Sequence, residues 1–507
     1  MSPGARHRIV PRRTVQYGVE NSPHPVKGTP VQTSEQSGPG FKKALNAFDS
    51  YALGFGAMIG FGWVVLSGGW LEDAGTLGAA IAMGGGGLIM ALVAYLYAEL
   101  TSAMPKAGGE HHYLMRGMGP RWAFVGSWGI TGGYISIVAF EAVALPRTIS
   151  YIWPEILDNP MYSIFGSEVA LTWALIGAVS AVVITAINYI GIKVAGVVQT
   201  FVVLFLVIVG ILLATGSFMN GTVSNMEPFF TDSAGLFTVL VVVPFLFVGF
   251  DVIPQASEEL NMSPRRIGRL IVVSVFIATL WYVLVIFTSS SAMSREALAA
   301  SDLATADAMG ALWNSQFMAN ILLAGGIAGI LTSWIALLIG ASRLMYAMGH
   351  SGMLPRWFGK LHPRFNTPSN AILFIGALSV AAPFFGTGML GWLVDSGSPS
   401  IVVTYFLVCI VFLMLRRREP EMERPFRSGR GKIGVMFGVL GAILTFGLLT
   451  LYIPGMPASI DPMSYVLCLL WWAIGMVFLF RIPRGIEAGV RTEAILLNTL
   501  RERRRKR

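Results

Sequence analysis

The sequence predicts an all-α integral membrane protein with twelve transmembrane helices. Of its 507 residues, 54% are hydrophobic and only 12% are charged, whereas soluble domains carry about 25% charged residues. Apolar runs of about 20 residues, the length that crosses a bilayer, recur along the chain. A large soluble protein would need charged helix faces, and these segments lack them.

We expect the twelve spans in the following order: Phe48–Trp70, Leu77–Met104, Trp122–Ile149, Val169–Ile190, Gly196–Gly216, Leu236–Ser257, Ile267–Ser289, Met318–Gly349, Ser369–Phe385, Met389–Leu415, Ile433–Tyr452 and Met463–Phe480. Cys409 and Cys468 both fall inside spans, so no disulfide framework is expected. No cluster of metal ligands is evident in the sequence, and we expect no cofactor.

Charged residues in the connections predict the orientation. One set of connections is basic and contains Lys106, Arg116, Arg121, Arg265, Arg266, Arg269, Arg356, Lys360, Arg364, Arg416–Arg418, Arg424, Arg427 and Arg430. The alternate set is acidic and contains Glu155, Asp158, Glu168, Glu227, Asp232, Asp302 and Asp307. The positive-inside rule then predicts a multi-pass protein of the plasma (inner) membrane with both termini in the cytoplasm.

The same asymmetry explains the net charge of +9, which is therefore no sign of a nucleic-acid partner. The closing segment Arg501–Arg507 is expected to meet anionic membrane lipid. His111 and His112 are expected to be solvated loop residues. The first 45 residues are rich in Pro, Ser and Gly, which predicts a disordered cytoplasmic tail.

The first span contains GAMIGFG, Gly56–Gly62, with three glycines among seven residues. Glycine costs about 1 kcal/mol relative to alanine inside a helix. One interpretation is close helix packing, because Gly56 and Gly60 form a small-xxx-small pair. The other is an unwound segment, which is tolerated at membrane depth only where protein or a water-filled cavity satisfies the backbone.

The sixth span is interrupted as well. Its sequence VVVPFLFVGFDVIPQASEEL carries Pro244, Gly249 and Pro254 near the middle, with Asp251 among them. Proline removes a backbone donor, and a carboxylate within a membrane usually has a functional partner. Interruptions five spans apart are typical of two five-helix halves related by an inverted repeat, which bind solute between their broken helices. This pairing favours the unwound interpretation.

Five local patterns resemble the amino acid–polyamine–organocation (APC) family of secondary transporters. They are GAMIGFGWV, AYLYAELTSAMPKAGGEHHYL (Ala94–Leu114), NYIGIKVAGVVQ (Asn188–Gln199), PFLFVGFDVIPQASEE (Pro244–Glu259) and GASRLMYAMGHSGMLP (Gly340–Pro355). The resemblance covers Phe48–Leu415 and implies a LeuT-like 5+5 inverted-repeat core with helices 1 and 6 broken. The expected division is a tail at 1–45, repeats at 46–216 and 217–418, two peripheral helices at 419–481 and a basic cytoplasmic tail at 482–507.

The resemblance also implies ion-coupled transport of amino acids or related amines by alternating access. Amides around Phe61 and Gly62 would hold a substrate carboxylate, and carbonyls of both broken helices would hold the amino group. Phe245 falls where the family often has an aromatic gate. The implied substrate site comprises Ala57, Met58, Ile59, Gly60, Phe61, Gly62, Phe245, Phe247, Val248 and Gly249.

The chain departs from the family at three positions. Phe61 stands between Gly60 and Gly62 where a small or hydroxyl residue is common, and Trp63 replaces an aliphatic residue. Many proton-linked members carry a lysine in the fifth helix at the position of Leu206. Related transporters place sodium there instead, which implies a sodium site at the carbonyls of Gly56, Ile59 and Gly329 and the hydroxyls of Thr332 and Ser333.

Sodium coupling, proton coupling and exchange, including exchange of amines or polyamines, are the alternatives at this point. Glu141 and Asp251 are the intramembrane carboxylates that could carry a proton. Glu258 and Glu259 could form an intracellular gate with Arg265 and Arg266. A channel or a sensor that does not cycle is the rival class. An enzyme is not expected, because the spans show no nucleophile–base constellation or metal-ligand set.

Overall fold

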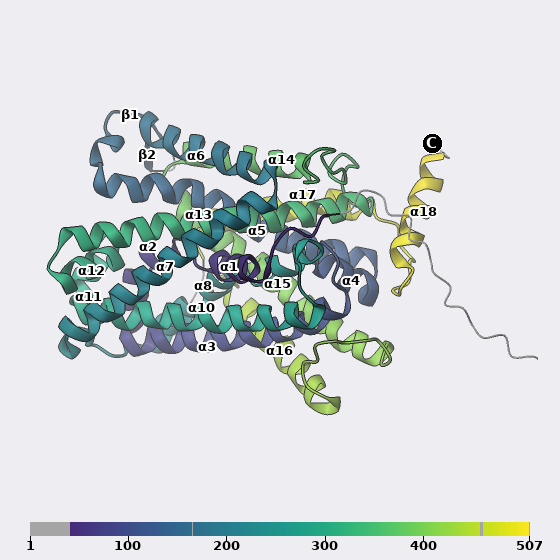
Figure 1. Cartoon of the computed structure of the whole chain (residues 1–507), viewed down its shortest axis with the longest axis horizontal. Coiled ribbons are helices and arrows are strands. Elements are labelled where there is room, and N and C mark those ends of the chain that lie inside the picture. The colour runs from purple at the N-terminus through teal and green to yellow at the C-terminus, as the bar shows by residue number, and fades with distance from the viewer. Residues whose placement is uncertain (1–40, 165, 457–459, 506–507) are drawn as a thin grey trace, which may run out of the picture. The chain divides into compact units, whose positions relative to one another are not determined.

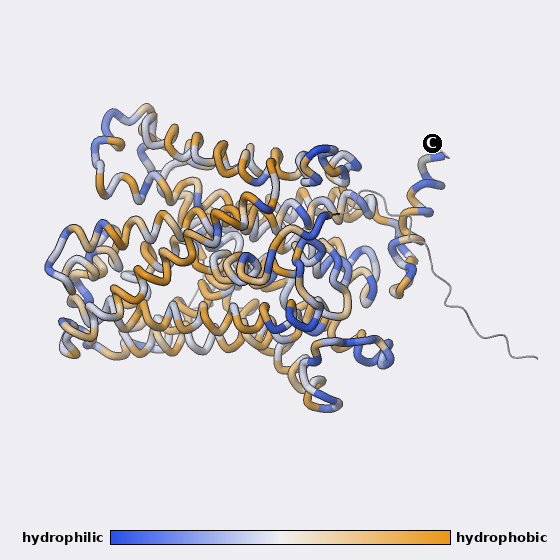
Figure 2. The backbone as a smooth tube through the Cα atoms, in the orientation of Figure 1, coloured by the Kyte–Doolittle hydropathy of each residue, from blue (hydrophilic) through white to orange (hydrophobic). Residues whose placement is uncertain are grey.

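The computed structural model describes residues 41–164, 166–456 and 460–505, which form a helical bundle (Figure 1). Eleven of its helical segments are long and apolar enough to cross a membrane, and a shorter apolar segment occupies Ser369–Phe385. Figure 2 shows hydrophobic residues along the helices and hydrophilic residues at the loops of both ends. The composition and the structure therefore agree on a helical multi-pass membrane protein.

The first half of the bundle, in chain order, consists of α1 (Ala47–Met58), α2 (Gly62–Val65), α3 (Ser67–Ala103), α4 (Glu110–Met118), α5 (Pro120–Ile152), η1 (Pro154–Leu157), β1 (Pro160–Ile164), β2 (Ser167–Ala170), α6 (Leu171–Ile190) and α7 (Ile192–Asn220). The strands β1 and β2 pair antiparallel as a small hairpin between α5 and α6.

The second half consists of η2 (Val223–Met226), α8 (Ser233–Phe247), α9 (Val252–Gln255), η3 (Ser257–Glu259), α10 (Pro264–Ala292), α11 (Arg295–Ala299), α12 (Ala304–Trp313), α13 (Gln316–His350), α14 (Ser369–Ala381), η4 (Ala382–Phe385), α15 (Met389–Arg418), α16 (Gly431–Leu451), α17 (Pro462–Leu479) and α18 (Thr492–Arg505). The predicted spans agree with these bounds to within a few residues, apart from the junction of the first two spans.

That junction lies at Gly75 inside α3. Gly75 has a φ of +71°, and this left-handed conformation separates Ser67–Ala74 from the rest of α3. A Cβ atom at Gly75 would lie 2.5 Å from the carbonyl oxygen of Pro228. Only glycine combines this backbone angle with so close an approach.

The chain before α1 is held more firmly than its composition suggests. Predicted disorder at residues 1–40 lies outside the described residues, but the prediction is wrong for Ala44 and Leu45. Their amides donate to the Glu259 carbonyl at 2.9 and 3.1 Å, and Leu45 is buried. A capping box between Asn46 and Asp49 then starts α1.

Helix α1 lies inside the bundle, where it packs against α7, α10 and α13. The most apolar stretch of α5 is 89% buried and that of α13 is 78% buried, compared with 28% in α16 and 11% in α17. Helix α7 is 28% buried as well, so α7, α16 and α17 are the exposed helices, and α5 and α13 form the core around α1. Side chains of these two core helices can reach the break in the first span.

Contacts between loops define two ends of the bundle. At the basic end, which contains residues 104–119, 260–263, 351–368 and 419–430, Arg116 pairs with Glu419 at 2.5 Å. At the acidic end, which contains residues 153–164, 166–170, 221–232 and 293–315, Asp302 pairs with Arg147 near the end of α5. The predicted basic and acidic connections thus gather at opposite ends.

His111 corrects one prediction about the basic end. It was expected to be solvated, but it is fully buried in α4, and its Nδ1 lies 3.1 Å from the Ser127 hydroxyl. Burial, together with the charges of His112 and His350, holds the pKa of His111 well below its ordinary value. His111 is therefore a neutral packing residue at physiological pH.

The close contact at Gly249 predicts that a methyl group there is costly. Gly249 has a φ of +140°, and a Cβ atom would lie 2.6 Å from the Ala57 carbonyl carbon. We expect Gly249→Ala to lower the free energy of unfolding by about 1–3 kcal/mol. The measurement is thermal unfolding of the purified protein in detergent.

Gly447→Ala is the matched control, because Gly447 lies in α16 with open space around its Cβ position and an ordinary φ. It should leave the melting temperature unchanged or raise it slightly. Equal melting temperatures for the two variants would contradict the tight contact between Gly249 and α1.

Candidate functional site

Two non-helical stretches meet in the centre of the bundle. Ile59, Gly60 and Phe61 separate α1 from α2, and residues 248–251 separate α8 from α9. The second stretch lies directly on the last turn of α1, because a Cβ atom at Gly249 would be 2.8 Å from the Met58 amide nitrogen. The backbones of the two breaks are therefore in contact.

Tyr282 of α10 joins the two breaks. Its hydroxyl oxygen lies 2.9 Å from the Met58 carbonyl oxygen and 3.2 Å from the Leu246 carbonyl oxygen, and its one proton is shared between these two acceptors. Each carbonyl ends a helical segment and would otherwise lack a partner at membrane depth. Sequence reasoning missed Tyr282; a buried polar hydroxyl within an apolar span was the available signal.

Glu141 of α5 lies at the first break. Its Oε1 accepts a hydrogen bond from the Ser333 hydroxyl of α13, and the Phe61 N–H also donates to this carboxyl group. A Cβ atom at Gly60 would be 2.5 Å from Oε1, so the glycine makes room for the carboxyl. A carboxyl group of the protein thus occupies an amide that was predicted to hold a substrate carboxylate.

The second oxygen of this carboxyl, Glu141 Oε2, is buried and has no hydrogen-bond partner among the described residues. Glu141 itself is 1% exposed, and no ion pair to it is found within the described part of the chain. A buried charge without a partner costs a great deal of free energy. The site therefore favours a neutral carboxyl or the arrival of a cationic group.

A small cavity of about 20 Å³ adjoins this carboxyl group. That is room for about one water. The predicted site residues that line it are Ala57, Met58, Gly60, Phe61, Gly62, Phe245 and Val248, and the further lining residues are Ile137, Phe140, Glu141, Leu246, Tyr282, Ser333 and Leu337. Apart from Glu141, Tyr282 and Ser333, these side chains are apolar or absent.

Three predicted site residues lie beside this cavity without lining it. Ile59 and Phe247 are fully buried, and Phe247 packs on Tyr282 with ring centroids 5.3 Å apart. Gly249 lies on α1 instead, as described above. The predicted gate residue Phe245 does line the cavity and packs edge-to-face on Phe140, with a centroid distance of 5.6 Å.

Asp251 satisfies the second break. Its Oδ1 accepts the Gly249 amide at 2.9 Å, and its Oδ2 accepts the Tyr405 hydroxyl at 3.0 Å. It does not line the cavity. Of the two carboxylates that could carry a proton, Glu141 lines the cavity and Asp251 holds the backbone beside it.

A buried ion pair lies on the side of the second break that leads to the basic end. Arg343 of α13 donates two hydrogen bonds to Glu259, at 2.9 and 3.1 Å, and the two side chains are 1% and 4% exposed. The expected pairing of Glu259 with Arg265 or Arg266 is wrong, because Arg343 is the partner. Glu258 instead accepts the Ala107 amide at 3.1 Å.

The predicted sodium ligands come together where α1 meets α13. A Cβ atom at Gly329 would lie 2.9 Å from the Ile59 carbonyl oxygen, and the Thr332 and Ser333 hydroxyls bond to the Gly329 carbonyl at 2.9 and 3.1 Å. At Gly56 the neighbouring group is a donor, because a Cβ atom there would be 2.4 Å from Gln199 Nε2.

The fit to sodium is therefore incomplete. The hydroxyls and carbonyls are the hard oxygen ligands that sodium prefers, but an amide NH₂ group repels a cation at the Gly56 side. Leu206, at the position of the family's lysine, is fully buried in α7.

Comparison with known proteins agrees with this architecture. Residues 45–474 match the protein family described as amino acid permease. The branched-chain amino acid permease BcaP of Bacillus subtilis is 26% identical over 450 residues, 87% of this chain and 93% of the relative. The methylthioribose transporter of the same organism is 27% identical over 467 residues, 90% of this chain and 97% of the relative.

The vacuolar cationic amino acid transporter 4 of Arabidopsis thaliana is 28% identical over 393 residues, 75% of this chain and 64% of the relative. These relatives are named permeases or transporters, so the chain is a transporter rather than an enzyme. The predicted APC resemblance is confirmed. Because the match spans most of its length, the chain belongs to the amino acid permease family.

Proposed function

We propose that the protein is a secondary active transporter that carries amino acids or related amines across the plasma membrane by alternating access. The observation that carries this proposal is the contact between two broken helices, bridged by Tyr282 and lined by backbone. Membrane helices are interrupted in this way where a solute or ion binds. The halves at 46–216 and 217–418 form the proposed inverted repeat, and the basic end faces the cytoplasm.

The cavity chemistry supports a substrate with an ammonium group and an apolar side chain. Glu141 is the acidic group in the lining, and Ile137, Phe140, Phe245 and Leu337 supply apolar surface. One of the compared relatives, from Bacillus subtilis, is named a branched-chain amino acid permease. We therefore propose branched-chain amino acids as the first substrates to test. Binding them requires the cavity to enlarge, with Phe245 moving away from Phe140.

Glu141 is the proposed coupling group. Its Oε2 faces no hydrogen-bond partner among the described residues, so an ionised carboxyl is costly until a proton neutralises it. The substrate then crosses with the proton on Glu141, so that proton and substrate move in the same direction. Such linkage would let a pH gradient drive uptake without a lysine at position 206.

Sodium is the second candidate for coupling. The proximity of the Ile59 carbonyl to Gly329, with the Thr332 and Ser333 hydroxyls nearby, supports a sodium ion at the predicted ligands. The Gln199 NH₂ group beside Gly56 counts against it. Proton and sodium coupling differ in the residues they require, so mutants separate them.

The first functional prediction concerns Glu141→Gln. Purified protein in proteoliposomes should accumulate labelled leucine against its gradient when an inward proton gradient is imposed. Glu141→Gln should abolish this accumulation, while counterflow exchange of leucine is retained, because glutamine keeps the hydrogen bond to Phe61 but carries no titratable proton. A channel or a sensor would give no accumulation in the wild type.

Thr332→Val is the matched test of sodium coupling. Ser333 contacts Glu141, so its replacement would affect both candidates. Within the described residues the Thr332 hydroxyl bonds only to the Gly329 carbonyl. We expect Thr332→Val to retain proton-driven uptake. Sodium-driven accumulation that Thr332→Val abolishes and Glu141→Gln retains would overturn the assignment of Glu141 and establish the second candidate.

Tyr282→Phe should disable transport while the protein still folds. Losing the hydroxyl leaves two buried carbonyls without this donor, at a cost of about 1–3 kcal/mol. Tyr452→Phe is the matched control, because the Tyr452 hydroxyl donates to the Val241 carbonyl at 2.7 Å away from the cavity. Thermal unfolding and leucine uptake are measured for both variants.

Both tyrosine variants should lower the melting temperature, but only Tyr282→Phe should reduce uptake, by about tenfold or more. If the two variants reduce uptake equally, the hydroxyl at position 282 is a general stabilising group. The proposed role of the bridge between the broken helices would then be wrong.

A further inference from the structure

A second cavity lies far from the broken helices, at the basic end, between the last turn of α15 and the first turn of α16. It has a volume of about 550 Å³. Five cationic side chains line it: Arg416, Arg424, Arg427, Arg430 and Lys432. The proposed transport function does not use any of them. We propose that this cavity binds the phosphate of an anionic phospholipid headgroup.

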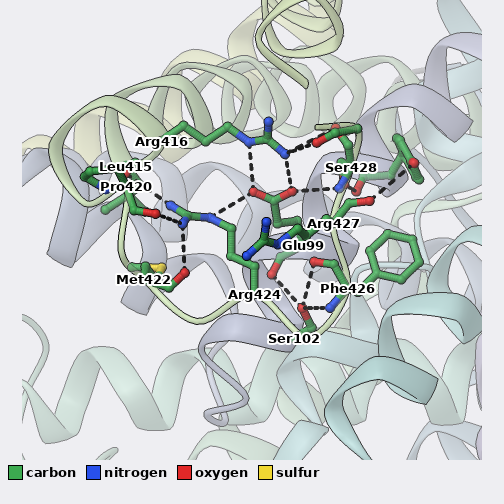
Figure 3. A network of polar contacts seen from close by, with 12 residues as sticks. Glu99, Ser102, Leu415, Arg416, Pro420, Met422, Arg424, Phe426, Arg427 and Ser428 are labelled. Carbon is green, nitrogen blue, oxygen red and sulfur yellow. Dashed lines mark hydrogen bonds and ion pairs between the residues drawn. The ribbon is translucent and has the colours of Figure 1, made fainter. Parts of the chain in front are cut away.

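One carboxylate organises the inner wall of the cavity. Glu99 of α3 is fully buried and accepts hydrogen bonds from Arg416 at 2.9 and 2.5 Å and from the Ser428 amide at 2.7 Å (Figure 3). Arg424 Nε also lies 3.0 Å from Glu99. Two guanidinium groups therefore share a single negative charge, which leaves positive charge in excess.

The outer wall adds positive charge that has no carboxylate partner among the described residues. Within the described part of the chain, no carboxylate oxygen lies within 4 Å of the charged atoms of Arg427, Arg430 or Lys432. Burial and the charges of Arg416 and Arg427 lower the pKa of Arg424, against the opposing effect of Glu99. An anion bound in the cavity would reduce the electrostatic repulsion between these cationic side chains.

The acidic residues of this segment do not cancel the excess. Residues 416–432 contain seven cationic and three acidic side chains. Of the acidic ones, Glu419 is paired with Arg116 on the side of α4, and Glu421 and Glu423 do not line the cavity. The anion that fits must therefore come from outside the chain. A phosphate group suits several arginines, because guanidinium binds its oxygens through paired hydrogen bonds.

The apolar surface next to the cavity favours a lipid over a soluble phosphate. Val435 lines the cavity and begins a stripe on α16 that continues through Val439, Ile443 and Phe446. These four side chains are 43–62% exposed. Exposed apolar residues on a peripheral membrane helix contact acyl chains, so a phospholipid could place its headgroup in the cavity and its chains along this stripe. Basic pockets at the membrane surface recognise anionic lipids in this manner.

A lipid bound in this cavity would also affect how the neighbouring helices pack. The loop that carries Arg424 and Arg427 also places Phe426 against α10, where a Cβ atom at Gly268 would be 2.9 Å from Phe426. The Phe426 amide donates to Ser102 of α3 at 3.1 Å. A phosphate held by this loop would therefore stabilise the contact between α3, α10 and α15.

The test compares lipid binding by the full-length protein and a triple variant. Arg427→Gln, Arg430→Gln and Lys432→Gln are combined, because these side chains have no carboxylate partner within the described residues and their loss leaves Glu99 paired. The control combines Arg501→Gln, Arg503→Gln and Arg505→Gln in α18, which removes equal charge elsewhere on the basic end. Phosphatidylglycerol or phosphatidylcholine is titrated into delipidated protein, and bound lipid is counted by native mass spectrometry.

We expect the wild type and the α18 control to bind one phosphatidylglycerol more tightly than phosphatidylcholine. Since each cation near an anionic lipid strengthens binding about fivefold, the triple variant should bind it about a hundredfold more weakly. If both triple variants bind phosphatidylglycerol equally weakly, binding depends on the total positive charge and not on this cavity, and the proposal is overturned. If the triple variant does not fold, Arg430→Gln alone should still weaken binding severalfold, and no change would overturn the proposal.

Inorganic phosphate at the same concentration distinguishes the two sources of this chemistry. The lipid proposal predicts that phosphate leaves the melting temperature unchanged while phosphatidylglycerol raises it in the wild type and not in the triple variant. An equal rise with phosphate alone would assign the cavity to a soluble phosphate compound and overturn the lipid assignment.

Discussion

Backbone groups that lie deep in a membrane must find partners within the protein, and this constraint governs the centre of the molecule. Two helices are interrupted side by side, and each interruption leaves carbonyls and amides free. Tyr282 supplies a donor to one carbonyl from each break, Asp251 accepts the Gly249 amide, and Glu141 accepts the Phe61 amide. The surrounding helices are needed because they deliver these three side chains.

The three partners are not equivalent, because only Glu141 has an oxygen next to the cavity without a hydrogen-bond partner in the part of the chain that the structure describes. Asp251 uses both oxygens, on the Gly249 amide and the Tyr405 hydroxyl. A carboxyl with both oxygens engaged holds a structure in place, whereas one with a free oxygen can still receive a proton or a ligand. This difference in hydrogen bonding, more than depth in the membrane, separates a structural carboxylate from a candidate coupling group.

Local sequence signals predicted the membrane class, the spans and the two interruptions, because glycine, proline and apolar length act within one segment. Partners that come from distant segments could not be predicted in this way. Tyr282, Ser333 and Arg343 lie in apolar runs whose sequences do not say which neighbour they face. The prediction that His111 is solvated was wrong for the same reason. A short helix between two spans looks like a loop in the sequence, and packing on α5 is what buries His111.

The proposed cycle sets a condition on how the basic end can open. Arg343 and Glu259 are each almost fully buried and satisfy one another through two hydrogen bonds. Separating them in a dry interior would leave two uncompensated charges, which costs several kcal/mol. Opening must therefore admit water to both groups as they part. Since Glu259 also holds the chain before α1 through its backbone carbonyl, movement there would be transmitted directly to the first broken helix. The ion pair and the first break are thus connected through α1, a helix of 12 residues.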